Sequence, residues 1–249
     1  MRVNDDVTVR GVRESGWRRF NNAYALHRAN KIILIDTGLQ RHASLLHDVV
    51  SLAAASGSSY TGTLRDVETV LLTHWHDDHV GGCSALPTAT KYLHAHDLVR
   101  LTSSPTDVLP LPVDRAVVSA VEPIEVGCHT PGSVAFHDRA SRTLFIGDFL
   151  GDAWVDRSTG WTDVLPTIAE ARVGVERLLD GRAGSVEGVS TFLAGLQRLR
   201  ECDARFLCPG HGGVRRGDVE RFLTVFITAT ERLLERTSHG AVVMRDAPE

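Results

Sequence analysis

The chain has 249 residues, 43% of them hydrophobic and 23% charged, with a formal net charge of −4 and a sequence pI near 6.3. This length and composition are sufficient for one compact domain that buries a large core. The acidic balance argues against nucleic acid as the main partner, because phosphate binding normally brings a basic face.

The N-terminal segment, residues 1–17, carries charges but no apolar run of the kind found in signal peptides. No apolar stretch approaches the length needed to span a membrane. The four cysteines show no CxxC spacing. We therefore expect a cytoplasmic protein with reduced thiols, no membrane partner and a small-molecule substrate.

Five apolar runs predict buried strands, and a residue of a metal-binding type follows each of them. In chain order these are KIILI before Asp36, VETVLLT before His74, VEPIEVGC before His129, RTLFIG before Asp148 and ARFLCPG before His211. In open α/β sheets, ligands bind at the carboxyl ends of the strands. We therefore expect these five residues to meet at one edge.

Helical patterns lie between and after the predicted strands. They cover residues 41–56, 167–179, 187–199 and 218–237, and their apolar stripes predict packing against a core. The alternation of strands and helices predicts the α/β class, with sheets covered by helices. Two segments without period, residues 102–114 and 149–166, read as irregular loops.

Residues 71–82 read LLTHWHDDHVGG and place three histidines and two aspartates within six positions. Imidazole and carboxylate are ligands that zinc and similar divalent ions prefer, so a metal site is favoured over a chance cluster of histidines. His74 and His76 share one side of an extended or tightly turned backbone. Asp78 and His79, further round the turn, can face a second ion.

The segment THWHDDHVGG, preceded by DTG and followed in order by CHTPGS, FIGD and CPGHGG, resembles the metallo-β-lactamase superfamily. The glyoxalase II and lactonase-like hydrolases are the most similar branch. The resemblance implies an αββα sandwich, with two mixed β-sheets flanked by helices. It also implies a single domain over residues 1–249, with a loop and helical insertion at about 149–203.

The family's metal ligands are carried over by position, and all seven positions are intact. The first ion would be held by His74, His76 and His129, the second by Asp78, His79 and His211, and both would share Asp148. Asp36 would orient the metal-binding loop without binding metal itself. The resemblance thus implies two divalent ions, with Zn²⁺ expected and iron or manganese as alternatives.

Hydrolysis of a small ester, thioester or lactone is the reaction that this site implies. Two metals about 3.5–4 Å apart can share a hydroxide at neutral pH and polarise a carbonyl oxygen. Asp78 would orient that bridging hydroxide, which makes Asp78 the expected catalytic residue. The sequence contains no GxSxG elbow, so a serine hydrolase is not predicted.

Three other functions stay open at this stage. They are a mononuclear iron oxidoreductase resembling the persulfide dioxygenases, a phosphodiesterase, and a non-catalytic protein that retains the fold. Only 38 residues (249 − 211) follow His211, fewer than the larger helical substrate domain of glyoxalase II needs, so glutathione thioesters are less favoured. The substrate, the physiological metal and the oligomeric state also stay open.

Five further residues carry weaker expectations. Trp154 and Trp161 either line an apolar substrate pocket or pack the insertion onto the core, since binding residues concentrate on loops. His94 and His96 are expected to be structural or on the surface. Cys128 is expected to be a small buried side chain, with a soft extra metal contact as the alternative.

Overall fold

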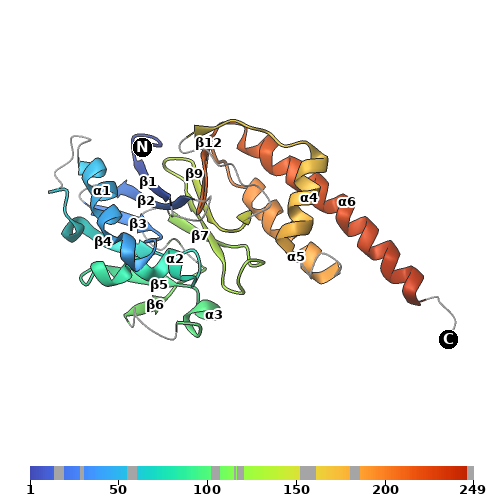
Figure 1. Ribbon diagram of the computed structural model, residues 1–249, viewed down its shortest axis with the longest axis horizontal. Helices are drawn as coiled ribbons and strands as arrows, with labels where there is room; N and C mark the ends of the chain where they lie inside the picture. Colours follow the sequence, from blue (N-terminus) through green and yellow to red (C-terminus); the bar gives the residue numbers. More distant parts are fainter. Residues whose placement is uncertain are drawn as a thin grey trace.

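Figure 1 shows the computed structural model of the protein, in which two β-sheets lie between helices. The structure describes residues 1–13, 20–28, 31–54, 61–101, 107–114, 116, 121–151, 161–179 and 186–245. In these ranges no helix is both long enough and apolar enough to cross a membrane.

The first sheet contains six strands. In hydrogen-bonded order they are β1 (Val7–Arg13), β2 (Phe20–Arg28), β3 (Lys31–Ile35), β4 (Val67–Leu71), β5 (Thr90–Leu93) and β6 (Val108–Pro110). Strands β1 to β3 are antiparallel, whereas β3 to β6 are parallel. The parallel half therefore presents the carboxyl ends of four strands along one edge.

The second sheet also contains six strands. In hydrogen-bonded order they are β10 (Trp161–Thr162), β12 (Val214–Arg216), β11 (Phe206–Pro209), β9 (Thr143–Gly147), β8 (Val134–Asp138) and β7 (Val121–Glu125). Strands β9 and β11 are parallel, so the residues that follow them emerge at the same edge.

The helices flank the sheets and connect their strands. The α-helices are α1 (Ala43–Ala54), α2 (Asp77–Val80), α3 (Ala95–Leu98), α4 (Ile168–Leu179), α5 (Val186–Arg200) and α6 (Val219–Arg245). Short 3-10 helices that lie wholly within the described residues are η1 (Gln40–His42), η2 (Leu64–Asp66) and η3 (Gly81–Ala85). Figure 1 shows α1 on one side of the sandwich and α4, α5 and α6 on the other.

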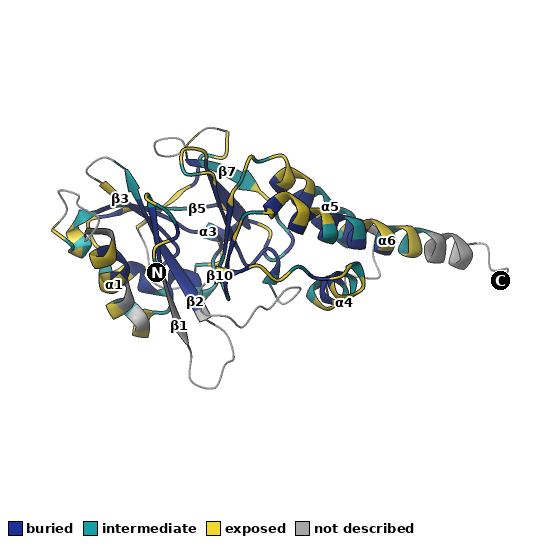
Figure 2. Ribbon diagram, turned by 90° about the horizontal axis from the view of Figure 1, so that it is seen from above, coloured by how far each residue is buried: buried dark blue, intermediate teal, exposed yellow. Residues whose placement is uncertain are grey.

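Three apolar clusters hold these layers together. Strand β3 contributes to two of them: Ile33 packs between the sheets, and Leu34 packs outward under α1. Alternate strand residues point to opposite faces, so a strand buried on both faces reads as a continuous apolar run. The third cluster joins the second sheet to α4, α5 and α6. Figure 2 shows the buried strands between helices whose outer faces are exposed.

The predicted fold class, an αββα sandwich of two mixed sheets, is confirmed. The five predicted strands are β3, β4, β7, β9 and β11, and the four predicted helices are α1, α4, α5 and α6. The expected insertion at 149–203 contains β10, α4 and α5. The single-domain organisation over residues 1–249 stays a prediction.

The expectation of two wholly irregular segments was wrong. Residues 108–110 form β6 and residues 161–162 form β10, each at the edge of a sheet. Both strands are too short to show a two-residue period, and an edge position tolerates Pro110 because one side of the strand needs no hydrogen bonds. Edge pairing was therefore invisible in the local pattern.

Candidate metal centre

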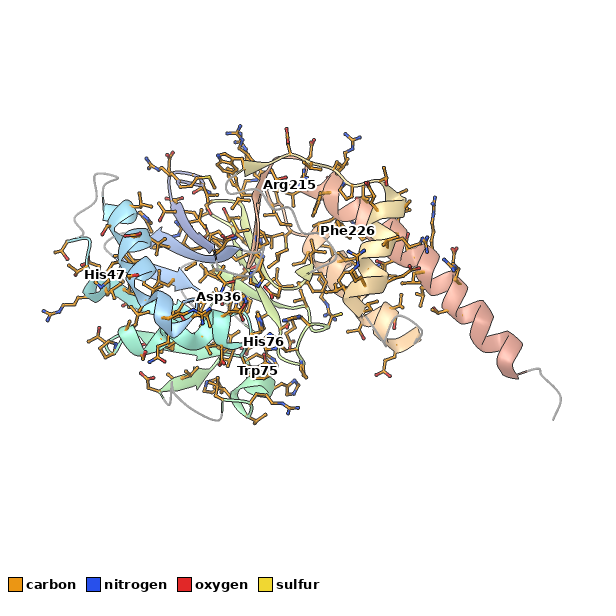
Figure 3. All side chains as sticks on the ribbon, in the orientation of Figure 1. Asp36, His47, Trp75, His76, Arg215 and Phe226 are labelled. Carbon is orange, nitrogen blue, oxygen red and sulfur yellow. The ribbon has the colours of Figure 1, made fainter. Side chains whose placement is uncertain are left out.

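The seven predicted ligands converge at the edge where the strand ends of both sheets meet. They form three overlapping groups: His74, His76 and His129; His74, His79 and Asp148; Asp78, His79 and His211. Within each group the ligand atoms lie within 4.8 Å of one another. Figure 3 shows Asp36, Trp75 and His76 toward this edge, far from His47 on α1.

The first group is built from two loops. His74 and His76 follow β4, and His129 follows β7. Nδ1 of His76 lies 3.0 Å from Nε2 of His74 and 3.0 Å from Nε2 of His129. Nitrogens about 2.0–2.1 Å from a tetrahedral zinc ion lie about 3.3 Å apart, so this spacing fits one ion.

The carboxylate of Asp148 lies between the first group and the remaining ligands. Its Oδ1 is 3.3 Å from Nε2 of His79, and its Oδ2 is 3.1 Å from Nε2 of His211. The same Oδ2 is 3.8 Å from Nε2 of His129 in the first group. Asp78 completes the arrangement, because its Oδ2 is 3.4 Å from Nε2 of His211.

Asp36 fixes the orientation of two of the imidazoles. Its Oδ2 lies 2.8 Å from Nδ1 of His79 and also accepts a hydrogen bond from Thr73 Oγ1. Thr73 Oγ1 in turn lies 3.1 Å from Nδ1 of His74. Because Nδ1 of each histidine can donate to an oxygen, these contacts favour the tautomers that leave both Nε2 atoms free for a cation. Asp36 itself has a φ of 58°, a conformation that is uncommon outside glycine.

Nε2 of His79 and Oδ1 of Asp148 are both buried and face each other at 3.3 Å, but neither makes a hydrogen bond in the described part of the protein. Buried polar atoms that lack a hydrogen bond cost free energy, so this pair of atoms calls for a ligand. Imidazole nitrogens and carboxylate oxygens suit zinc, iron and manganese. The residues present therefore fit a divalent metal site.

Glycines allow the backbone to pass close to this cluster. A Cβ at Gly82 would lie 2.3 Å from the carbonyl oxygen of Thr37, and a Cβ at Gly210 would lie 2.4 Å from Oδ1 of Asp148. The chain therefore passes closely behind the segment of residues 76–79. A side chain at Gly210 would displace the ligand carboxylate itself.

The cluster has two halves that differ in charge. The first half is His74, His76 and His129, and the second half is Asp78, His79 and His211, with Asp148 between them. Burial and the neighbouring His79 hold the pKa of His74 well below its usual value, and burial lowers the pKa of His129 to about 4. In the other half burial is outweighed: Asp148 and Asp36 raise the pKa of His79 well above its usual value. Asp148 and Asp78 likewise raise the pKa of His211 to about 9. Near neutral pH the first half is therefore uncharged, and the second is an ion-pair cluster.

A small pocket opens beside Asp148 and His211. Most of its remaining wall is apolar, formed by Ile146, Leu150, Leu207, Pro209 and Phe222, with Thr162 and Arg215 as polar members. Trp161 does not line it; the residue is 38% exposed, and the centroid of its ring lies 6.1 Å from that of Phe206. For Trp161 the packing alternative is favoured, whereas Trp154 lies outside the described residues.

The remaining expectations concern residues around the cluster. His94 is buried against Glu125, with 3.0 Å between Nε2 and Oε1, and His96 is exposed, as the structural or surface interpretation requires. Cys128 is buried in the apolar cluster of the second sheet and belongs to none of the three ligand groups. It adopts a φ of 71°, the backbone conformation for which glycine is best suited.

Sequence reasoning missed Thr73, Asp97 and Asn22, which bind the loops that carry the ligands. Asp97 follows β5, the parallel neighbour of β4, and is fully buried. A signal was available, since a carboxylate just after a short strand that follows the metal-binding segment can reach the same edge as the ligands.

Comparison with known proteins identifies relatives of this chain. Residues 16–211 match the family model of the metallo-beta-lactamase superfamily. The beta-lactamase-like protein 2 homolog of Drosophila melanogaster is 30% identical over 173 residues, covering 64% of this chain and 54% of that protein. The atrochrysone carboxyl ACP thioesterase of Aspergillus fumigatus is 24% identical over 223 residues, covering 86% and 42% respectively. The chain spans about half the length of these relatives.

Solved structures share the fold. A metallo-beta-lactamase family protein from Thermus thermophilus matches with a TM-score of 0.61 and 23% identity, covering 99% of this chain and 85% of that one. The rubredoxin oxygen:oxidoreductase of Desulfovibrio gigas matches with a TM-score of 0.68 and 16% identity, covering 96% and 61%. Because the family model covers well over half of the chain and reaches the last predicted ligand, His211, the protein belongs to the metallo-β-lactamase superfamily.

Proposed function

We propose that this protein is a dinuclear metal-dependent hydrolase of a small-molecule ester, thioester or lactone. The observation that carries the proposal is the convergence of seven histidine and aspartate side chains in three overlapping groups. His74, His76 and His129 would hold one ion, and Asp78, His79 and His211 the other. Asp148 would contact both, because its two oxygens face ligands of both sets. Zn²⁺ is the metal we propose, with iron and manganese as alternatives.

A pair of bound divalent ions supplies an activated water at neutral pH and an electrophile for a carbonyl oxygen. Two of the chain's own carboxylates have distinct roles beside these ions. Asp78 is 33% exposed at its side chain, whereas Asp148 is 8% exposed, so Asp78 is the carboxylate that can face incoming water and substrate. We assign to Asp78 the orientation of the attacking water. Asp36 keeps His79 in the tautomer that the site needs.

A thioester is the substrate class that the relatives support best. Two of them, from Aspergillus fumigatus and a Cryptosporiopsis species, are named as atrochrysone carboxyl ACP thioesterases. The pocket beside Asp148 and His211 adds an apolar surface on which an acyl group can pack. Apolar walls with few polar groups are typical of small-molecule sites.

A substrate panel tests this proposal. Metal-free protein is loaded separately with Zn²⁺, Mn²⁺ or Fe²⁺ and offered acyl thioesters, aryl esters, lactones and a phosphodiester. We expect metal-dependent hydrolysis of a carbonyl substrate, with thioesters turned over fastest. Oxygen consumption with a persulfide by the iron form alone would instead support the oxidoreductase alternative, and cleavage of only the phosphodiester would support the phosphodiesterase.

We also predict that the two halves of the centre respond differently to pH. Metal binding displaces the protons of its ligands. His211, with a pKa of about 9, and His79, with its raised pKa, both hold protons at neutral pH that Zn²⁺ must displace. Affinity of the second half should therefore rise with pH up to about 9. His129, with a pKa of about 4, holds none, so affinity of the first half should be flat above pH 5.

Calorimetry in buffers of different ionisation enthalpy measures this difference directly. The variant His74→Ala retains the second half, and His211→Ala retains the first. Proton release on Zn²⁺ binding at neutral pH should be found in His74→Ala and be near zero in His211→Ala. Equal proton release in the two variants would contradict the assignment of charge to the two halves.

A further inference from the structure

The ligands of each half stand on separate loops, and in each half one buried side chain outside the three ligand groups fixes a ligand loop. For the first half this side chain is Asp97, at 0% exposure, which joins both loops; for the second it is Asn22, at 6%, which binds the loop of His211. We propose that Asp97 and Asn22 are positioning residues, each of which sets the metal affinity of one half of the centre. The inference rests on the proposed metal centre but not on the substrate.

Asp97 connects the loop after β4 to the loop after β7. Its Oδ2 accepts hydrogen bonds from the backbone N–H of Trp75, at 3.2 Å, and from Oγ1 of Thr130, at 2.6 Å. Its Oδ1 accepts one from the backbone N–H of Gly132, at 2.9 Å. Trp75 stands between His74 and His76, and Thr130 follows His129. One carboxylate thus binds the backbone or a neighbour of every ligand in the first half.

The close approach of the second loop supports this role. A Cβ at Gly132 would lie 2.7 Å from Cγ of Asp97 and 2.9 Å from Nδ1 of His94. The loop can reach the carboxylate only because residue 132 is glycine. Nδ1 of His94, whose Nε2 contacts Glu125, lies near the same glycine. The loop of His129 therefore packs tightly against the Asp97 carboxylate.

Asn22 serves the loop that carries His211. The amide nitrogen of its side chain donates to the carbonyl oxygens of Pro209, at 3.0 Å, and Gly212, at 2.9 Å. Its backbone N–H donates to the carbonyl oxygen of Gly210, at 2.8 Å. Tyr24, two residues along β2, adds a 2.6 Å hydrogen bond from its hydroxyl to Pro209. The first sheet thereby fixes a ligand that the second sheet supplies.

The side chain of Asp97 accepts hydrogen bonds, whereas the side-chain amide of Asn22 donates them. Exchanging Asp and Asn at each position therefore tests the role of each residue with almost no change in side-chain size. Three donors face Asp97, so Asp97→Asn turns an N–H group toward a donor and loses at least one hydrogen bond. Two carbonyl oxygens face the side-chain amide of Asn22, so Asn22→Asp places a carboxylate oxygen against acceptors. Each exchange keeps the size of the side chain while reversing its hydrogen-bonding character.

The test measures Zn²⁺ dissociation constants at one pH by competition with a chromophoric chelator, in single-site backgrounds. In His211→Ala, which retains the first half, Asp97→Asn should weaken Zn²⁺ binding about 10- to 100-fold and Asn22→Asp should leave it unchanged. In His74→Ala, which retains the second half, Asn22→Asp should weaken Zn²⁺ binding about 10- to 100-fold and Asp97→Asn should leave it unchanged. No substrate is present, so a protein without the proposed hydrolase activity would still give this pattern.

A matched control separates positioning from loss of stability. Asp138 is also a carboxylate at 0% exposure, and it accepts a 3.0 Å hydrogen bond from Ser141 N–H at the end of β8 remote from the ligands. Asp138→Asn should lower the melting temperature of the metal-free protein without changing either dissociation constant. If Asp138→Asn weakens Zn²⁺ binding as much as Asp97→Asn does, the positioning role is overturned.

Milder variants keep the test decisive if Asp97→Asn or Asn22→Asp does not fold. Thr130→Val removes one donor to Asp97, and Thr130→Ser should restore the wild-type affinity of the first half. Tyr24→Phe removes the hydroxyl that binds Pro209 and should weaken only the second half. Equal weakening of both halves by each of these variants, or no weakening by any of them, would overturn the proposal.

Discussion

Asp148→Asn should lower turnover by at least about 100-fold, the scale seen when a group that stabilises charge in the transition state is lost. The substitution keeps the size of the side chain and one metal-binding oxygen. It removes the negative charge that offsets repulsion between two cations, at a position where both carboxylate oxygens face ligand nitrogens within 3.3 Å. Metal content should fall from two ions per chain toward one, as measured by elemental analysis of the purified protein.

Asp36→Asn is the matched comparison for that experiment. Asp36 is also a buried carboxylate in the cluster, at 2% exposure, but it contacts Thr73 and Nδ1 of His79 instead of the converging ligand atoms. Its loss should weaken metal binding about 10- to 100-fold, and excess metal should restore activity. Near-normal turnover in Asp148→Asn with two metals still bound would disprove the shared-ligand role of Asp148.

His211→Ala and His74→Ala should each empty one half of the centre. His211 lies 3.1 Å from Asp148 and 3.4 Å from Asp78, so its removal should release the second ion and leave the first. His74, whose Nε2 is 3.0 Å from Nδ1 of His76, should have the reverse effect. Loss of one metal in a two-metal site removes an electrophile and a water-activating cation, so turnover should fall by at least about 100-fold in both variants.

Cobalt substitution distinguishes the two variants. The ligand sets of the two halves differ, because the first offers three histidines and the second offers Asp78, His79 and His211. Each variant should therefore retain a different part of the visible absorption spectrum of the Co²⁺-loaded wild type. The two partial spectra should sum approximately to that of the wild type. A His211→Ala protein with unchanged metal content and turnover would show that the last motif has been assigned wrongly.

The asymmetry between the halves has a functional consequence for loading of the metal. In the metal-free protein the first half is a set of neutral imidazoles, while the second is held together by ion pairs of His79 and His211 with Asp148. At neutral pH an incoming ion meets no bound proton in the first half. We therefore expect Zn²⁺ to fill the first half before the second.

Much of the ligand set could be predicted because it is encoded locally. KIILI before Asp36 and FLCPG before His211 show continuous apolar runs, which strands buried on both faces require, and each run stops at a ligand-type residue. Parallel neighbours such as β3 and β4 then bring their carboxyl ends to one edge. Spacing within HWHDDH determines which imidazoles can share an ion. These features need no knowledge of distant contacts.

Residue type and local periodicity in the sequence determined the α/β class and the edge at which the candidate ligands meet, and the resemblance to the metallo-β-lactamase superfamily supplied the full set of candidate ligands. Only the tertiary structure decided which residues orient those ligands. Asn22 and the loop of His211 are separated by 187 to 190 positions, and Asp97 and Gly132 by 35. The opposite pKa shifts of His129 and His211 likewise depend on burial and on carboxylates brought in from other strands. Hydrogen bonds and charges of this kind act across space, so no local pattern contains them.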